Sequence, residues 1–316
     1  MTGAPVPEGA DCVVMVEHVH QDAGCIRLDT ARSITSGENI VPAGAEASQG
    51  AVILPVGLCL GANHIGAAAA CGYAHVSVHP RPTVAILATG DELVELDQPL
   101  LPFQIRNSNS YSLAAQVQQA GAEPLRLPVA PDDPAQIEES IRGALQSADI
   151  LILSGGVSAG RFDFVETALL GLGAEFLFTG VLMQPGRPVV FGRLPAKGGH
   201  AARYFFGLPG NPVSTLVTFA LFVQPVIDAI AGASPEAPRF VLARLGANLN
   251  VKPGLTRFLP ALLRNSSPFE TEVFPIAWQG SGDLANTAKA NCFVVVPADR
   301  GRIIAGETVS VLFSEA

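Results

Sequence analysis

The sequence predicts a multidomain protein of the α/β plus β class: a central α/β domain with a mostly parallel sheet, a β-rich N-terminal unit and a small C-terminal β barrel. Two observations predict the central domain. Strand-like apolar runs alternate with helix-length segments from Thr83 to about Ala231, as they do in βαβ units. Three of these runs, at residues 83–88, 149–153 and 204–206, each stop at a glycine-bearing turn. We therefore expect the three turns along one edge of one sheet, where open α/β sheets bind ligands.

The N-terminal part of the chain divides into two segments. Residues 1–56 alternate turn signals with β-prone runs and predict the β-rich unit, which begins abruptly; its expected strands are 12–16, 24–28 and 51–54. Residues 57–81 are expected to complete this domain as a connector, with a helix at 61–71 and a strand at 74–78. Pro80 and Pro82 then mark a boundary.

The central domain is assigned to residues 82–231 and the C-terminal domain to residues 238–316. Helices of the central domain are expected at 110–120, 134–146, 163–172 and 212–230. A Gly, Ala and Pro-rich linker follows. Short β runs separated by turns then predict the barrel, at 240–245, 257–263, 270–274, 293–296 and 308–313.

Charge and composition exclude several classes of partner. The chain of 316 residues has a net charge of -9 and shows no cluster of Lys and Arg, which argues against a nucleic-acid partner. We expect no membrane span and no secretory signal, and hence a cytoplasmic protein. The five cysteines form no C-x-x-C pair, so neither a disulfide framework nor a zinc site is predicted; we expect small buried apolar side chains.

The three turns at the predicted sheet edge favour a phosphate-bearing ligand. They are T-G-D-E at 89–92, S-G-G-V-S-A-G-R-F-D at 154–163 and G-L-P-G-N-P at 207–212. Glycine lets backbone N–H groups approach an anion closely, and a helix N-terminus favours negative charge. Tight strand-to-helix turns without a ligand are the alternative, and two glycine turns at neighbouring strand ends weigh against it. The candidate residues are Ser154, Gly155, Gly156, Ser158, Pro209, Gly210, Asn211 and Pro212.

Carboxylates near the same edge predict a Mg²⁺ site, since Mg²⁺ binds one or two carboxylates together with ligand phosphates. The candidates are Asp91, Glu92, Asp132, Asp133 and Asp163. Asp133 precedes Pro134 and reads better as a helix N-cap, and Asp163 could cap the next helix. Two successive residues cannot both be caps, so Asp91 and Glu92 are the stronger metal candidates.

One cation stands near these turns. Arg187, in the segment Q-P-G-R-P at 184–188, could pair with a phosphate or another oxyanion. A surface arginine in a proline-rich turn is an equally good interpretation. All six histidines lie outside the three turns, which argues against a nucleophilic triad.

The ordered set of motifs resembles the molybdopterin molybdenumtransferases, the family that includes the C-terminal catalytic domain of gephyrin. The motifs are T-G-D-E-L, S-N-S-Y, D-D-P, S-G-G-V-S-A-G-x-x-D, P-G-R-P and G-L-P-G-N-P-V-S. The first eleven residues, G-S-G-D at 280–283 and A-N-C-F at 290–293 extend the resemblance over nearly the whole chain. Each motif is weak alone, and their order is specific.

The resemblance implies a reaction, a cofactor and partners. Molybdate is inserted into molybdopterin delivered in adenylylated form, AMP is released and Mg²⁺ is required. Asp91 and Glu92 would serve the metal and, with Asp163 and Arg187, catalysis. Substrate would be bound by Thr2, Asn109, Asp132, Asp133, Ser154, Gly155, Gly156, Ser158, Pro209, Gly210, Asn211 and Pro212. The family also implies a homodimer, whose partner subunit supplies Thr2, and a molybdopterin adenylyltransferase as a possible partner protein.

Three departures from the family pattern are visible. The family normally has a further segment upstream that contains a D-G-Y/F-A motif, which is absent from this chain. An R-x-x-G-E-D turn is replaced by P-A-G-A-E at 42–46, and K-P-G-K-P by Q-P-G-R-P. We therefore expect a chain that lacks the usual N-terminal segment.

Two other functions stay open. The chain could be a catalytically impaired molybdopterin-binding or scaffold protein, or a molybdopterin adenylyltransferase. Clustered carboxylates favour the transferase over a scaffold, because their mutual repulsion costs stability. Adenylyltransferases usually consist of the α/β domain alone, so the flanking β domains also favour the transferase. The sequence does not distinguish molybdate from tungstate.

Overall fold

A computed structural model of the chain describes residues 2–29, 32–155, 164–196, 202–234, 237–267 and 270–313. The chain divides into two compact units, residues 1–76 and 77–316, which are described separately. The division falls inside the connector expected at residues 57–81.

The described residues of the first unit form one β hairpin and one helix of regular length. A 3-10 turn, η1 (Val16–His18), leads into strand β1 (Val19–Asp22), which pairs antiparallel with β2 (Cys25–Leu28). The hairpin turns through Ala23 and Gly24, both with positive φ, as a two-residue turn between twisted strands requires. Helix α1 (Ala62–Ala70) follows later in the unit. The strand expected at 24–28 and the helix expected at 61–71 are confirmed.

The strands expected at 12–16, 51–54 and 74–78 are wrong, since those residues form no strand. A strand is stable only where it gains a ladder partner and covers an apolar face. No described residue of the first unit is buried, and Val52 is 80% exposed. The cysteine expectation fails here too, because Cys25, Cys59 and Cys71 are exposed; Cys292, in the second unit, is buried.

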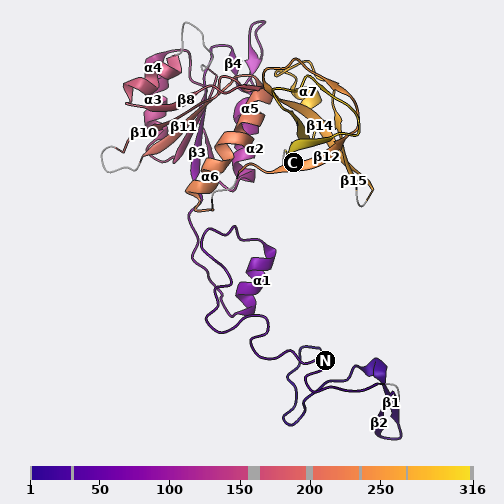
Figure 1. Cartoon of the computed structure of the whole chain (residues 1–316). Coiled ribbons are helices and arrows are strands. Elements are labelled where there is room, and N and C mark those ends of the chain that lie inside the picture. The colour runs from indigo at the N-terminus through magenta and orange to yellow at the C-terminus, as the bar shows by residue number, and fades with distance from the viewer. Residues whose placement is uncertain are drawn as a thin grey trace. The chain divides into compact units, whose positions relative to one another are not determined.

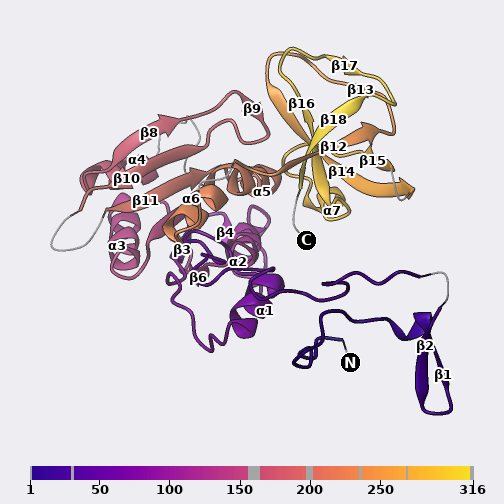
Figure 2. The same ribbon diagram turned by 60° about the horizontal axis from the view of Figure 1, so that its bottom comes forward.

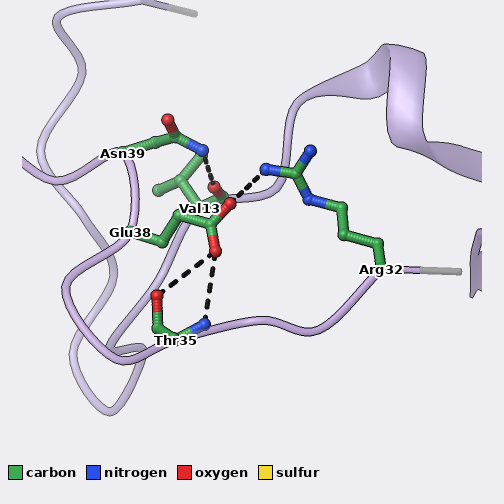
Figure 3. Close-up of polar contacts among 5 residues, drawn as sticks. All are labelled: Val13, Arg32, Thr35, Glu38 and Asn39. Carbon is green, nitrogen blue, oxygen red and sulfur yellow. Dashed lines mark hydrogen bonds and ion pairs between the residues drawn. The ribbon is translucent and has the colours of Figure 1, made fainter.

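Polar contacts hold a loop of the first unit together (Figure 3). The Glu38 carboxylate accepts hydrogen bonds from the Arg32 guanidinium and from the backbone N–H of Thr35 at 3.2 Å. Asn39 donates through Nδ2 to the carbonyl of Val13 at 2.7 Å. The Arg32 hydrogen bond is the largest cause that lowers the pKa of Glu38 below its usual value. Side-chain polar groups therefore order a loop that has no apolar core.

The second unit is built on a six-stranded sheet with the order β6-β3-β7-β11-β10-β8. The strands are β6 (Glu123–Arg126), β3 (Thr83–Ala88), β7 (Ile150–Ser154), β11 (Arg203–Leu208), β10 (Val190–Leu194) and β8 (Glu175–Thr179). Strand β3 pairs in parallel with β6 and β7, and β7 pairs in parallel with β11. Strand β10 is antiparallel to both neighbours. The predicted mostly parallel sheet is confirmed.

Helices cover both faces of this sheet (Figure 1). Helices α3 (Pro134–Ala144) and α4 (Phe164–Gly171) pack on one face, where Leu87, Ile137 and Leu151 are fully buried. The other face is covered by α2 (Asn109–Gln119) and by a continuous helix at Pro212–Ile230. That helix consists of α5 (Pro212–Thr218), a π-helical turn, η2 (Phe219–Val223), and α6 (Gln224–Ile230). All four predicted helices are confirmed within a few residues.

Among the described residues, the Pro212–Ile230 helix is the one long and apolar enough to cross a membrane by length and composition. Apolar side chains along this helix pack inside the protein, in two clusters. Phe219, Val223 and Ile227 lie in the core under the sheet. Val213 and Val217 lie in a second cluster, which includes Phe293 of the C-terminal domain.

The C-terminal domain is a closed β barrel of five strands. They are β12 (Phe240–Leu245), β14 (Thr256–Ser267), β15 (Glu270–Pro275), β16 (Cys292–Val296) and β18 (Thr308–Phe313). Their order is β15-β12-β18-β16-β14, and the β14–β15 pairing closes the ring. Each predicted β run falls within one of these strands, so the barrel is confirmed. Burial raises the pKa of the Cys292 thiol in its core to about 11.

Short elements join the barrel to the α/β domain (Figure 2). Strand β9 (Met183–Gln184), from the segment between β8 and β10, pairs in parallel with β14 of the barrel. Helix α7 (Leu284–Thr287) follows the loop at residues 280–283.

Two further short strand pairs each lie within one domain. Strand β13 (Leu249–Asn250) pairs with β17 (Arg302–Ile303), and β4 (Leu93–Val94) pairs with β5 (Ile105–Arg106).

Candidate functional site

The ends of β3, β7 and β11 lie level with one another. Ala88 pairs with Ser154, and Ser154 pairs with Leu208. The residues that follow all three strands therefore stand along one sheet edge, as the sequence predicts. Thr89 extends β3 beyond this level, where it forms a bridge to Ala130, and its N–H donates to the carbonyl of Ser154 at 3.1 Å.

Gly155 allows the ends of β3 and β7 to approach closely. Its φ is +97°, and a Cβ atom there would lie 2.7 Å from the carbonyl oxygen of Thr89. Backbone cannot move aside as a flexible side chain can, so no other residue fits without displacing a strand. Gly155 N–H also donates to the carbonyl of Leu208 at 3.3 Å. The glycine expected from the sequence is thus required by backbone packing, whatever ligand is bound.

An acidic pocket of about 540 Å³ opens on the α3 and α4 side of this edge. It is lined by Thr89, Gly90, Asp91, Glu92, Asp132, Ile137, Phe164 and Val165. Asp91 accepts a hydrogen bond through Oδ1 from the N–H of Asp132 at 3.1 Å. Gly90 has a φ of +143°, and a Cβ there would lie 2.6 Å from Oε2 of Glu92. The glycine therefore lets the Glu92 carboxylate fold back over the turn.

The three carboxylates of the pocket interact electrostatically. The pKa of Asp132 is raised above its usual value, mainly by partial burial and then by the negative charges of Asp91 and Glu92, while a backbone hydrogen bond from Asp91 opposes the shift. Burial and like charges both disfavour the ionised form. The pocket offers carboxylate oxygens and no cationic side chain among its lining residues, so it suits a positively charged ligand.

Asp133 stands beside this cluster and caps α3. Its Oδ1 accepts from the N–H groups of Ala135 at 2.9 Å and Gln136 at 3.0 Å, with Pro134 at the first helical position. The N-cap interpretation is confirmed. A role of Asp133 in substrate binding stays a prediction.

A second polar set lies on the other face of the same edge, at the start of α2. Asn109 donates through Nδ2 to Oγ of Ser154 at 3.0 Å and to the carbonyl of Gly210 at 2.8 Å. A carbonyl only accepts, which assigns the amide nitrogen to this side. Oδ1 of Asn109 is then buried without a partner among the residues that the structure describes. It is an acceptor available to an N–H or O–H group of a ligand.

The predicted turn residues 209–212 lie next to Asn109 and contact the C-terminal domain. The Pro209 carbonyl accepts from the Thr215 hydroxyl at 2.7 Å. Asn211 is the N-cap residue of α5 and donates through Nδ2 to Oγ of Ser281 at 2.9 Å. The carbonyl of Ser281 accepts from the N–H of Val213 at 3.0 Å. The site therefore borders on a barrel loop.

Arg187 stands farther along the edge. Val190, at the start of β10, pairs with Gly207 and with Thr179, so the loop before it reaches the same edge. Strands β7 and β11 separate β10 from β3, a lateral distance of about 14 Å at about 4.8 Å per strand. The Arg187 side chain is exposed. The structure places it with the Asn109 side, because a Cβ on Gly186 would meet Thr218 of α5 at 2.5 Å.

Four predicted site residues cannot be placed at this edge. Gly156, Ser158 and Asp163 lie outside the described residues. Thr2 belongs to the first unit. Within the described ranges, no group of three or more His, Cys, Asp or Glu side chains is arranged to hold a metal ion. Two further residues, Thr89 and Ser281, were not predicted as site residues, although they belong to the motifs T-G-D-E-L and G-S-G-D.

The fold and the site define a class: an α/β domain with a polar sheet edge, joined to a β barrel. Three family models match this architecture. Residues 85–229 match a probable molybdopterin binding domain, residues 1–72 the MoeA N-terminal region (domain I and II), and residues 242–313 the MoeA C-terminal region (domain IV).

Relatives along the whole chain identify the family. The chain is 38% identical to the molybdopterin molybdenumtransferase of Nostoc sp. and 36% identical to that of Bacillus subtilis. These alignments cover 98% and 99% of this chain, and 70% and 71% of the relatives. The MoeA crystal structure from Pyrococcus horikoshii matches with a TM-score of 0.77 at 28% identity, over 99% of this chain and 74% of that one. The chain belongs to the molybdopterin molybdenumtransferase family, enzymes that are transferases of molybdenum cofactor biosynthesis.

Proposed function

We propose that the chain inserts molybdate into molybdopterin that is delivered in adenylylated form, with a requirement for Mg²⁺ and with release of AMP. The observation that supports the proposal most is that two different sets of polar groups lie on the two faces of the same sheet edge. One is an acidic pocket without a cation among its lining residues, and the other presents a buried amide acceptor beside a glycine turn. A ligand with a metal-bound phosphate end and a hydrogen-bond donating end would match both.

The donor set of the acidic pocket fits Mg²⁺. Mg²⁺ prefers oxygen ligands, keeps several waters and uses one or two carboxylates together with substrate phosphates. Asp91 and Glu92 are exposed at the pocket and would hold the ion. Bound there, Mg²⁺ would act as a Lewis acid on a phosphate or molybdate oxygen. Asp132 would lie beside it, its ionised form favoured by the added positive charge.

The chain's own residues would bind and orient the organic part of the substrate. Asn109 would accept a hydrogen bond from an N–H or O–H donor of the ligand, since its own amide donors are already used. Arg187 would pair with an anion farther along the edge. Gly155 keeps the strand ends close, and the remaining predicted binding residues would line the turns: Ser154, Gly156, Ser158, Asp163, Pro209, Gly210, Asn211 and Pro212.

The expected partners are part of the same proposal. A homodimer would supply Thr2 to the site from the partner subunit, and a molybdopterin adenylyltransferase would deliver the substrate. The cytoplasm is the proposed location. Family models that match both regions flanking the α/β domain favour the transferase over an adenylyltransferase.

The test is cofactor formation from adenylylated molybdopterin, molybdate and Mg²⁺, with AMP release as the readout. We expect Asp91→Asn and Glu92→Gln to abolish AMP release without loss of folding, because both side chains are exposed. Asp97→Asn is the matched control: Asp97 is an exposed carboxylate of the same segment that does not line the pocket. Equal activity of all three variants and the wild type would contradict the proposal.

The same assay distinguishes a transferase from a binding or scaffold protein. A chain that binds adenylylated molybdopterin but releases no AMP under any Mg²⁺ concentration would be a binding protein. The assay should be run both on this chain and on a version extended upstream to the family's usual start.

A further inference from the structure

Thr89 carries a buried hydroxyl that is not hydrogen-bonded to any described residue. The residue is only 3% exposed, and its Oγ1 has no hydrogen-bond partner in the described structure. Buried polar groups are nearly always paired, so an orphaned hydroxyl calls for a specific explanation. Within the described ranges, five other buried polar side-chain atoms are also unpaired, on Arg32, Asn109, Ser110, Gln116 and Arg203. Thr89 is the one that lines the acidic pocket.

The position of the hydroxyl follows from the strand. Side chains alternate along β3, so Thr89 shares a face with Ala85 and Leu87, whose core also contains Ile137 and Val165. Ile137 and Val165 line the pocket too. Oγ1 of Thr89 lies 3.4 Å from the position that a Cβ on Gly155 would occupy. A side chain at Gly155 would therefore stand directly against the hydroxyl, and glycine avoids this contact.

The charges around the hydroxyl decide which ligand suits it. Asp91, Glu92 and Asp132 line the same pocket, so an anion arriving alone would be repelled. A hydrated divalent cation is attracted, and it needs uncharged oxygen atoms in addition to carboxylates. The volume of about 540 Å³ exceeds that of six waters, at about 30 Å³ each. A hydrated cation therefore fits with room for a ligand oxygen.

We propose that the Thr89 hydroxyl is an additional oxygen ligand, direct or through one water, for a divalent cation held by Asp91 and Glu92. This inference rests on the proposed function, which places Mg²⁺ in this pocket. Thr89 supplies an oxygen without adding a negative charge to three carboxylates that already repel one another. A hydroxyl oxygen keeps two acceptor lone pairs, which can face a cation.

The test is Thr89→Val, which removes the hydroxyl and keeps the branched shape of the side chain. Mn²⁺ is the probe, and its binding to the full chain is followed by the loss of the free Mn²⁺ signal in electron paramagnetic resonance. We expect the Kd for Mn²⁺ to rise about tenfold, the size of one hydrogen bond to a charged group. Without metal, the Tm should stay equal or rise, because the valine leaves no donor or acceptor unpaired.

Two matched variants serve as controls. Ser110→Ala removes another buried, unpaired hydroxyl that does not line the pocket, and it should leave both the Tm without metal and the Kd for Mn²⁺ close to wild type. Thr215→Val removes a buried hydroxyl that donates to the carbonyls of Pro209 and Asn211, and it should lower the Tm. The difference in Tm between Ser110→Ala and Thr215→Val shows whether the measurement distinguishes a hydroxyl that donates a hydrogen bond from one that has no described partner.

The outcomes distinguish this inference from the proposed function. If wild type binds Mn²⁺ no better than Asp91→Asn, the metal site itself is absent and both proposals fall. If wild type binds better than Asp91→Asn but equally to Thr89→Val, only the role of Thr89 is overturned. A lower Tm of Thr89→Val without metal would show that the hydroxyl has a structural partner, which also overturns the inference.

Discussion

At the residue scale, close backbone approach shapes the candidate site as much as charge does. Gly155 and Gly90 both have positive φ and both have a neighbour where a Cβ would stand. They differ in what that neighbour is. At Gly90 it is the end of the flexible Glu92 side chain, whereas at Gly155 it is the backbone of Thr89. Substitution of Gly155 should therefore disturb the sheet edge itself.

We predict that Gly155→Ala destabilises the protein by about 2 kcal/mol or more, through the combined cost of an unfavourable φ and a clash with backbone. The measurement is urea unfolding followed by circular dichroism. Gly121→Ala is the control: Gly121 has a φ of +79° with no atom within 4 Å of a Cβ, so it carries the conformational cost alone, about 1 kcal/mol. Equal effects of the two substitutions would show that no clash exists.

Sequence patterns predicted some residues of the site and missed others for a physical reason. Asp91 and Glu92 could be predicted because two charged residues directly after a buried strand have few structural explanations. Thr89 could not be predicted, because what distinguishes it is a buried hydroxyl without a described partner. That burial depends on how α3 and α4 pack on the sheet. Ser281 was missed because its contact with Asn211 joins two distant parts of the chain.

At the element scale, prediction succeeded where local signals and burial agree. Helix α3 has an Asp–Pro start and buries Ile137, Ile141 and Ala144 on one face, so both its beginning and its inner face could be predicted. In the first unit the β-prone runs at 12–16 and 51–54 have the right composition but no sheet to join. A strand forms only beside a neighbouring strand, and the composition of a segment does not show whether such a neighbour is present.

The loop at residues 280–283 depends on one carboxylate. Asp283 caps α7 by accepting from the N–H of Asn286 at 3.1 Å, and it also accepts from the N–H of Gln279 and from Nδ2 of Asn286. These bonds, with the Asn286 side chain as the largest cause, lower the pKa of Asp283 below its usual value. The loop presents Ser281 to Asn211, so the ionised Asp283 supports the border of the candidate site.

We predict that the stabilisation by Asp283 depends on pH in one direction. Because its folded pKa lies below the unfolded value of about 3.9, the stabilisation is complete above that value and is lost as pH falls through the folded pKa. The measurement is the Tm difference between wild type and Asp283→Asn, which does not titrate, from neutral pH downward. Wild type should be the more stable at neutral pH, and the gap should shrink in acid. A gap that stays constant would contradict the prediction.

At the scale of the whole molecule, buried residues are distributed unevenly between the two units. The four apolar clusters found among the described residues all lie in residues 77–316, and the described part of the first unit has none. Burial of apolar surface is the main source of folding stability. The apolar cores that stabilise the second unit are therefore made by its own residues.

We predict that residues 77–316 fold without the first unit. A chain shortened to these residues should show a cooperative thermal transition with a Tm within a few degrees of that of the full chain. Circular dichroism in the far ultraviolet is the measurement. Loss of the cooperative transition would show that the first unit stabilises the second. The full chain, tested at the same protein concentration, is the control, because association would make the Tm depend on concentration.

The Pro212–Ile230 helix contributes side chains to two apolar clusters at once. Phe219, Val223 and Ile227 pack beneath the parallel sheet, while Val213 and Val217 pack against Phe258 and Phe293 of the barrel. A continuous helix that is shared in this way couples the unfolding of one domain to that of the other. We therefore expect damage to the barrel wall, far from any carboxylate, to loosen the ligand-binding edge as well. Variants with weakened activity should accordingly arise at positions that no substrate ever touches.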